Sequence, residues 1–75
     1  MKEIVEVIAK SLVDRPDDVT VEEIADGDQI TLKLHVAADD MGKVIGRQGR
    51  IAKAMRTVVK AAATRESKKV TVEII

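Results

Sequence analysis

Apolar residues recur at helical spacing at the start of the chain, over residues 2–13. They lie three or four positions apart along one stripe, which is the pattern of an amphipathic helix. The stripe consists of Ile4, Val5, Ile8, Ala9 and Leu12. Pro16 has no backbone N–H to donate, so the helix cannot continue through it. We therefore expect a helix over residues 2–13.

Three later segments alternate between apolar and polar residues, which predicts strands with one buried face. The first is short and contains Val19 and Val21. The sequence Asp26-Gly27-Asp28 that follows is a hairpin turn signal, so the first two strands should pair antiparallel. The apolar positions of the other two strands are Ile30, Leu32, Leu34 and Val36, and then Val70, Val72 and Ile74.

Helical spacing returns between residues 39 and 64, but a pair of glycines interrupts it. Asp39 is the expected N-cap of a short helix that ends at Ile45, and Asp40 suits the first turn of that helix. A longer helix follows the glycines and ends near Thr64. Its apolar stripe is defined by Ile51, Met55, Val58 and Ala62.

The resulting order of elements is α-β-β-α-α-β. Because a helical crossover separates the last two strands, we expect them to run parallel with a right-handed connection. The 75 residues are enough for one small domain, residues 1–75, with a single core. The predicted fold class is therefore α+β, with three helices on one face of a three-stranded mixed sheet in two layers.

Charge is distributed unevenly along the chain, although the net charge is zero. Residues 1–40 contain 11 acidic and 4 basic residues, whereas residues 41–75 contain 2 acidic and 9 basic residues. The two parts therefore carry −7 and +7. Such asymmetry favours a nucleic-acid or other anionic ligand for the basic part. The alternative is a charged surface that is paired with the acidic part of the same chain.

Several classes of protein are disfavoured by composition. Cysteine is absent, which excludes disulfides and thiolate metal sites, and His35 is the only histidine, so we expect no metal and no other cofactor. Glu3 and Glu6 interrupt the first apolar stretch, which is therefore neither a secretory signal nor a membrane span. No nucleophile lies in a catalytic motif. We expect a cytoplasmic binding protein rather than an enzyme.

Residues 44–49, VIGRQG, are the strongest functional signal. Two glycines so close together mark a turn between two helices, and without side chains they let a ligand approach the backbone. The helix that follows would offer free N–H groups and the positive end of its dipole to a phosphate. Arg47 can donate two hydrogen bonds to such a group, and Gln48 can donate one. An ordinary solvated corner between helices is the alternative.

The order of elements and this turn together resemble a type II KH domain. The segments RPDDV and DMGKVIGRQGRIAKAMRTVVKAAA and the overall length are similar to the stand-alone bacterial KH proteins of the KhpA type. The resemblance covers the whole chain. It implies an RNA-binding protein whose GxxG loop, residues 46–49, holds single-stranded RNA by its backbone. Such proteins are small RNA chaperones or post-transcriptional regulators.

The resemblance also implies which residues contact RNA. The bases would enter an aliphatic groove, which suits a chain without Phe, Tyr or Trp. The groove would lie between the helices around the loop and the last strand, and for each of its apolar residues core packing is the alternative. The expected floor is Ile45, Ile51 and Val70 or Val72, with Lys68 and Lys69 at the far side. The expected RNA-binding residues are Lys43, Ile45, Gly46, Arg47, Gln48, Gly49, Arg50 and Lys53.

The second half of the long helix is apolar on more than one side. If Val58 and Ala62 face the core, Val59 and Ala63 face outward. Apolar surface left over on so small a domain predicts a partner. We expect a homodimer or, from the family resemblance, a heterodimer with a larger KH-containing RNA-binding protein. The alternative function is a protein-interaction module that uses the KH fold without touching RNA, and a phosphate-binding enzyme subunit is less favoured.

Overall fold

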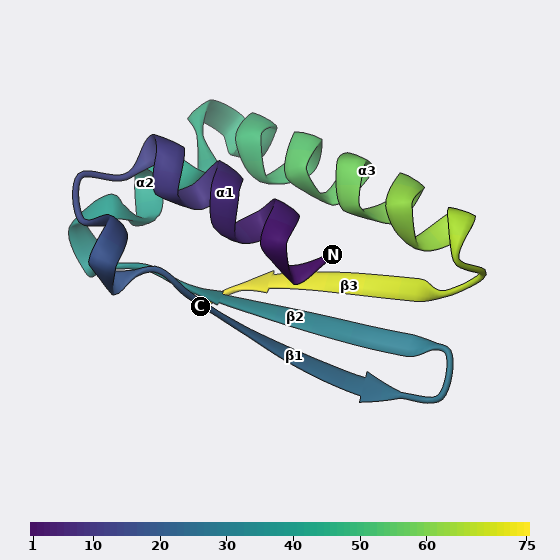
Figure 1. Cartoon of the computed structure of the whole chain (residues 1–75). Coiled ribbons are helices and arrows are strands. Elements are labelled where there is room, and N and C mark those ends of the chain that lie inside the picture. The colour runs from purple at the N-terminus through teal and green to yellow at the C-terminus, as the bar shows by residue number, and fades with distance from the viewer.

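Three helices cover one face of a three-stranded sheet in the computed structural model, which describes residues 1–75 (Figure 1). The helices are α1 (Lys2–Leu12), α2 (Met41–Ile45) and α3 (Arg50–Arg65), and the strands are β1 (Thr20–Asp26), β2 (Gln29–His35) and β3 (Lys69–Ile74). Short 3-10 turns precede β1, α2 and α3, namely η1 (Pro16–Asp18), η2 (Ala38–Asp40) and η3 (Arg47–Gly49). The predicted α-β-β-α-α-β order and two-layer α+β class are confirmed.

The sheet has the order β1-β2-β3, with β1 and β2 antiparallel and β2 and β3 parallel. Asp26 pairs with Gln29 across a two-residue turn in which Gly27 has φ +60°, a backbone conformation that glycine adopts without strain. Both predicted pairings are therefore confirmed. Strand β1 is seven residues long and begins after Val19, so it is longer than the short strand that the sequence predicted.

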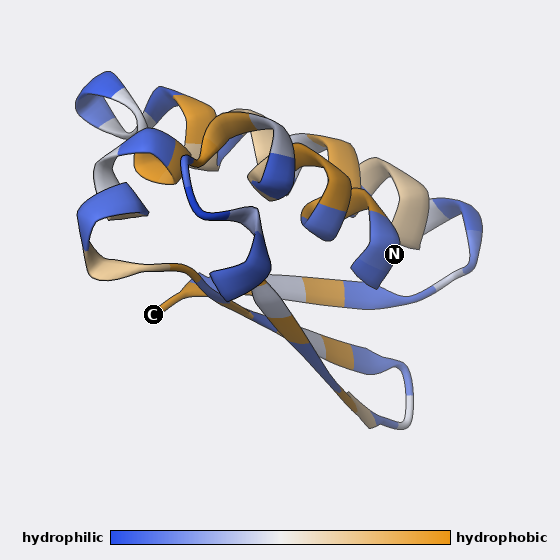
Figure 2. Ribbon diagram, turned by 60° about the vertical axis from the view of Figure 1, so that its left-hand side comes forward, coloured by the Kyte–Doolittle hydropathy of each residue, from blue (hydrophilic) through white to orange (hydrophobic).

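The core lies between the sheet and the helices. Leu32 and Leu34 of β2 are fully buried, because β2 is the central strand and α1 and α3 cover its inner face. Apolar and polar positions alternate along the strands, as the orange and blue bands in Figure 2 show. The core cluster is Val5, Ala9, Val19, Val21, Ile30, Leu32, Leu34, Val44, Met55, Val59 and Val72. No helix of the chain combines the length and the apolar character needed to cross a membrane.

Helix α3 is rotated relative to the prediction. Its buried residues are Ala52, Met55, Val59 and Ala63. Val58, which was expected in the core, leaves half of its side chain exposed, at 50%. Val58 and Val59 are equally apolar, so the sequence pattern alone could not choose between two stripes that differ by one residue. The stripe that packs on the sheet has alanine at both of its ends, and such small side chains let a helix lie close to the strands.

The start of α2 also differs from the prediction. Asp39 is exposed and no side chain caps α2, so the predicted Asp39 N-cap is wrong. Asp40 occupies the N-cap position instead, but its buried carboxylate turns away from α2 and accepts hydrogen bonds from the backbone of Asp14 and Arg15. A contact between segments 25 and 26 residues apart outweighs the local capping preference of an aspartate.

Candidate nucleic-acid interface

The GxxG loop, residues 46–49, reverses the chain between α2 and α3. Gly46 has φ +77° and ψ 174°, a combination that essentially only glycine adopts, and Gln48 and Gly49 both lie in the left-handed region. The amide of Gly46 donates to the carbonyl oxygen of Gly42 at 2.8 Å, and the amide of Gly49 donates to that of Gly46 at 3.1 Å. Local hydrogen bonds therefore fix the shape of the loop.

The two glycines of the loop serve different purposes. A Cβ atom on Gly46 would lie 2.6 Å from Cγ1 of Ile51, so this glycine is required for packing inside the protein. A Cβ atom on Gly49 would meet no atom within 4 Å. Gly49 is therefore the position at which a ligand can approach the bare backbone, whereas the sequence suggested the same purpose for both.

Three of the predicted cationic side chains lie around Gly49. The side chains of Arg47 and Lys53 are exposed and form no hydrogen bond or ion pair within the chain. Nη2 of Arg50 donates to Oε1 of Gln48 at 3.3 Å, which leaves the amide nitrogen of Gln48 free to donate. No side chain caps the start of α3, where the amide of Arg50 donates to the carbonyl oxygen of Arg47, and the positive end of the helix dipole lies beside these cations. The site can hold an anion.

Lys43 is placed differently from the other predicted cations. Its ammonium group pairs with the carboxylates of Asp14 and Asp40, and the hydrogen bond to Asp14 raises the pKa of Lys43 above its ordinary value. Lys43 therefore lies in an ion-pair cluster between α2 and the end of α1. The predicted cations within and after the loop therefore lie around Gly49, whereas Lys43, before the loop, does not join them.

A shallow hollow between α3 and the free edge of β3 extends this basic surface. Arg56 and Lys60 line it together with Val70, Thr71 and Val72, and Nε of Arg56 donates to the carbonyl oxygen of Val72 at 3.2 Å. The sequence prediction missed both cations. The sequence did contain evidence for these two cations, because residues 53, 56 and 60 share one side of a helix.

The structure divides the predicted groove floor. Val70 and Val72 line the hollow beside β3, and Ile45 stands partly exposed, at 36%, just before the loop. Ile51 instead faces the opposite side of α3, towards α1. Lys68 and Lys69 are exposed but do not line the hollow.

Comparison with known proteins identifies the family of this fold and site. The KhpA/KhpB KH-domain family model matches residues 2–74. The chain belongs to this family. It is 68% identical over 75 residues to the RNA-binding protein KhpA of Clostridium perfringens and 61% identical to that of Caldanaerobacter subterraneus, with the whole of each pair covered. It is 44% identical to the RNA-binding protein KhpA of Chlamydia muridarum, of which it covers 96%.

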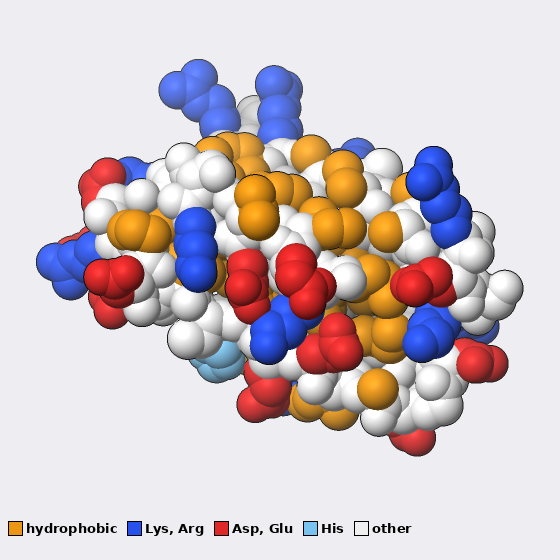
Figure 3. Space-filling model, in the orientation of Figure 1, with side chains coloured by type: hydrophobic (Ala, Val, Ile, Leu, Met, Phe, Trp, Pro, Cys, Tyr) orange, Lys and Arg blue, Asp and Glu red, His pale blue; other side chains and the backbone are white.

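A second surface of this KH domain is apolar and lies on the other side of α3. Two adjoining hollows that share Val58 make up a groove between α1 and α3, and its apolar lining residues are Ile4, Ile8, Leu12, Ile51, Ala54, Met55, Val58, Ala61 and Ala62. Arg50 and Arg65 stand at its two ends. Figure 3 shows apolar side chains gathered along these two helices. Helix α3 thus separates an apolar groove from the basic hollow beside β3.

Proposed function

We propose that this KH domain binds single-stranded RNA, with the GxxG loop against the phosphate backbone. The observation that carries the proposal is the loop itself. An unpaired Arg47 stands beside the open backbone of Gly49, and the uncapped start of α3 follows. The relatives that share the whole length of the chain are named RNA-binding proteins, which supports the same ligand here.

The residues around the loop have distinct parts in this proposal. Arg47 donates two hydrogen bonds to a phosphate, and the free amide nitrogen of Gln48 donates one more. The bare backbone of Gly49 and the positive end of the α3 dipole face the phosphate oxygens, while Lys53 and Arg50 add charge nearby. Ile45 offers an apolar surface to a sugar or base. Gly46 acts indirectly, through its packing on Ile51.

The bases would follow α3 from the loop to the hollow beside β3. Residues 53 to 60 of a helix span about 10 Å, so Lys53, Arg56 and Lys60 form a basic track of this length. The aliphatic side chains of Val70 and Val72 would contact the bases at its end. Phosphate contacts position a strand without reading its sequence, so any base preference would arise in the hollow. We expect binding without catalysis, in the cytoplasm.

A salt titration tests the phosphate role of this surface. A site that neutralises about 2–4 phosphates of single-stranded RNA should lose affinity with a slope of roughly −1.5 to −3 in log affinity against log salt concentration. Fluorescence anisotropy with a short labelled RNA measures this slope. An affinity that does not change with salt would contradict the proposal.

The apolar groove favours a second property, self-association through α1 and α3. We propose that a second copy of the chain covers the groove in a symmetric dimer, because the same apolar stripe would then meet itself. Val58 lies at the centre, since it borders both halves of the groove. A larger KH-containing protein is the alternative occupant. In either case the basic hollow, on the other side of α3, would stay open to RNA.

A further inference from the structure

Asp40 is the only charged residue in the core of the protein, with 2% of its surface exposed. Burial alone would raise the pKa of its carboxyl group. The N–H groups of Asp14 and Arg15 and the charge of Lys43 together outweigh burial and hold the pKa below its ordinary value of 3.8. Asp40 is therefore a buried, ionised carboxylate whose charge depends on these partners.

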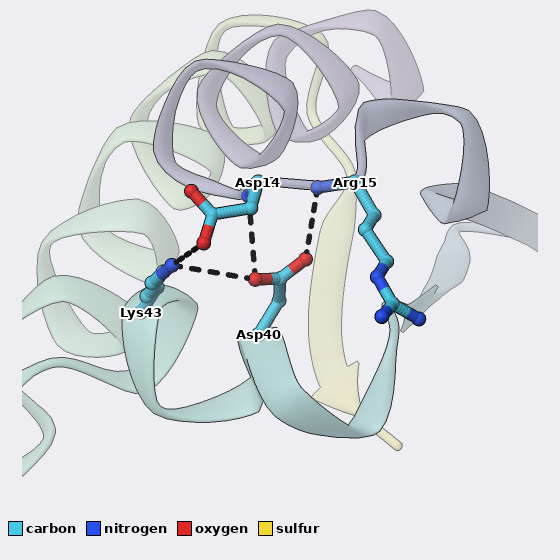
Figure 4. Close-up of polar contacts among 4 residues, drawn as sticks. All are labelled: Asp14, Arg15, Asp40 and Lys43. Atoms are coloured by element: carbon cyan, nitrogen blue, oxygen red, sulfur yellow. Dashed lines mark hydrogen bonds and ion pairs between the residues drawn. The ribbon is translucent and has the colours of Figure 1, made fainter.

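The contacts of Asp40 tie α2 to the segment that follows α1. One oxygen accepts the amide of Asp14 at 3.3 Å, and the other accepts the amide of Arg15 at 3.1 Å. Lys43 lies 3.6 Å from the first oxygen and also pairs with Asp14 (Figure 4). The guanidinium of Arg15 points away from this cluster in Figure 4, so Arg15 contributes only its backbone.

Helix α2 depends on such external contacts. It has only five residues and no side-chain cap, and a helix of this length has no stability of its own. Val44 packs in the core and fixes one side of α2, while the Asp40 cluster fixes its first turn. The loop follows directly, because the amide of Gly46 bonds to Gly42 within the same helix. A shift of α2 therefore shifts Arg47 and Gly49.

We propose that Asp40 and Lys43 are positioning residues of the GxxG loop, and that Lys43 makes no phosphate contact. The Asp40 carboxylate holds α2 against the end of α1, and Lys43 neutralises the two carboxylates at this point. The loop is thereby fixed in its RNA-binding shape before RNA arrives. This inference rests on the proposed function, since the loop is taken as the site of RNA contact.

Salt dependence separates a positioning lysine from a phosphate-binding one. The variant Lys43→Met should bind RNA more weakly than the parent by roughly threefold or more at every salt concentration, with the same slope. The control Lys53→Met removes a free cation just after the loop and should reduce the slope by about 0.7. If Lys43→Met reduces the slope as Lys53→Met does, or leaves affinity unchanged, the inference is overturned.

Amide exchange tests the positioning without RNA. In Asp40→Asn the amides of Gly46 and Gly49 should exchange severalfold faster than in the parent, while those of the central strand β2 keep their protection. If Asp40→Asn does not fold, Lys43→Met gives the same comparison, since the side chain of Lys43 is partly exposed. Unchanged exchange at both glycines would overturn the inference. If the parent binds no RNA, the proposed function fails. The exchange rates of Gly46 and Gly49 would still test whether Asp40 and Lys43 position the loop.

Discussion

At the scale of single residues, the two glycines of the loop have different purposes in the proposed function, which are packing for Gly46 and ligand approach for Gly49. Gly46 is enclosed by Ile51, and Gly49 faces open space. The sequence predicted the turn, but it could not assign these separate purposes, because both depend on where Ile51 lies after folding. The contacts of Asp40 could not be predicted from the sequence either, since the amides that its carboxylate accepts belong to residues 25 and 26 positions away.

Replacement of each glycine by alanine should separate these purposes. Gly46→Ala forces alanine into a backbone conformation that costs on the order of 2–3 kcal/mol, and the clash with Ile51 adds to this cost. Gly49→Ala meets no neighbour and should cost about 1 kcal/mol, for the left-handed backbone alone. Urea unfolding measures both free energies. Equal losses for the two variants would show that the packing of Gly46 on Ile51 is unimportant.

At the scale of the elements, sequence patterns located every helix and strand but not the orientation of α3. The period of 3.6 residues predicts a helix, and two adjacent apolar stripes satisfy it equally well here. Only the shape of the sheet decides which stripe is buried. Arg56 and Lys60 line the hollow beside β3, and the sequence analysis did not assign them to the site, although they share one side of α3 with the predicted Lys53.

The end of α3 offers a test of local backbone strain. The amide of Lys68 donates to Ala63 and the amide of Ser67 to Thr64, which is a Schellman motif with serine at φ +58° where glycine is usual. Ser67→Gly should therefore stabilise the protein by about 1 kcal/mol. The same change inside α1, Ser11→Gly, should destabilise it by about 0.5 kcal/mol. Thermal unfolding of both variants checks the opposite signs.

At the scale of the whole molecule, the fold presents three different surfaces. The basic surface runs from the loop to β3, the apolar groove lies between α1 and α3, and the outer face of the sheet is mixed in charge. The α-β-β-α-α-β order and the parallel pair were predictable, because connection rules leave few topologies for so short a chain. The sequence also predicted leftover apolar surface on α3, but it placed that surface at Val59 and Ala63, because it put Val58 in the core.

Self-association should respond to a charge in the groove but not to a charge elsewhere. Val58→Glu should turn a dimer into a monomer, because a buried, unpaired carboxylate would lie at the centre of the interface. Ile24→Glu places the same charge on the outer face of the sheet, where Ile24 is 42% exposed, and should leave the dimer intact. Sedimentation equilibrium distinguishes the two. A parent protein that is monomeric at high concentration would exclude the homodimer.

RNA binding by the loop is tested most directly by replacing Arg47 and Gln48 together with aspartate. Both side chains are exposed, and aspartate tolerates the left-handed backbone of residue 48, so stability should change by no more than about 0.5 kcal/mol. Two carboxylates would then face the phosphates. A control that replaces Lys10 and Ser11 with aspartate makes the same change in net charge on the exposed side of α1.

The decisive measurement is the affinity of these two variants for a short single-stranded RNA, beside their thermal unfolding. Loss of the charged hydrogen bonds of Arg47 and the new repulsion should weaken binding by the loop variant at least about tenfold, or roughly 1.4 kcal/mol. The Lys10 and Ser11 variant should bind nearly as well as the parent. If the loop variant stays folded and binds RNA as tightly as the parent, the GxxG loop is not the binding site.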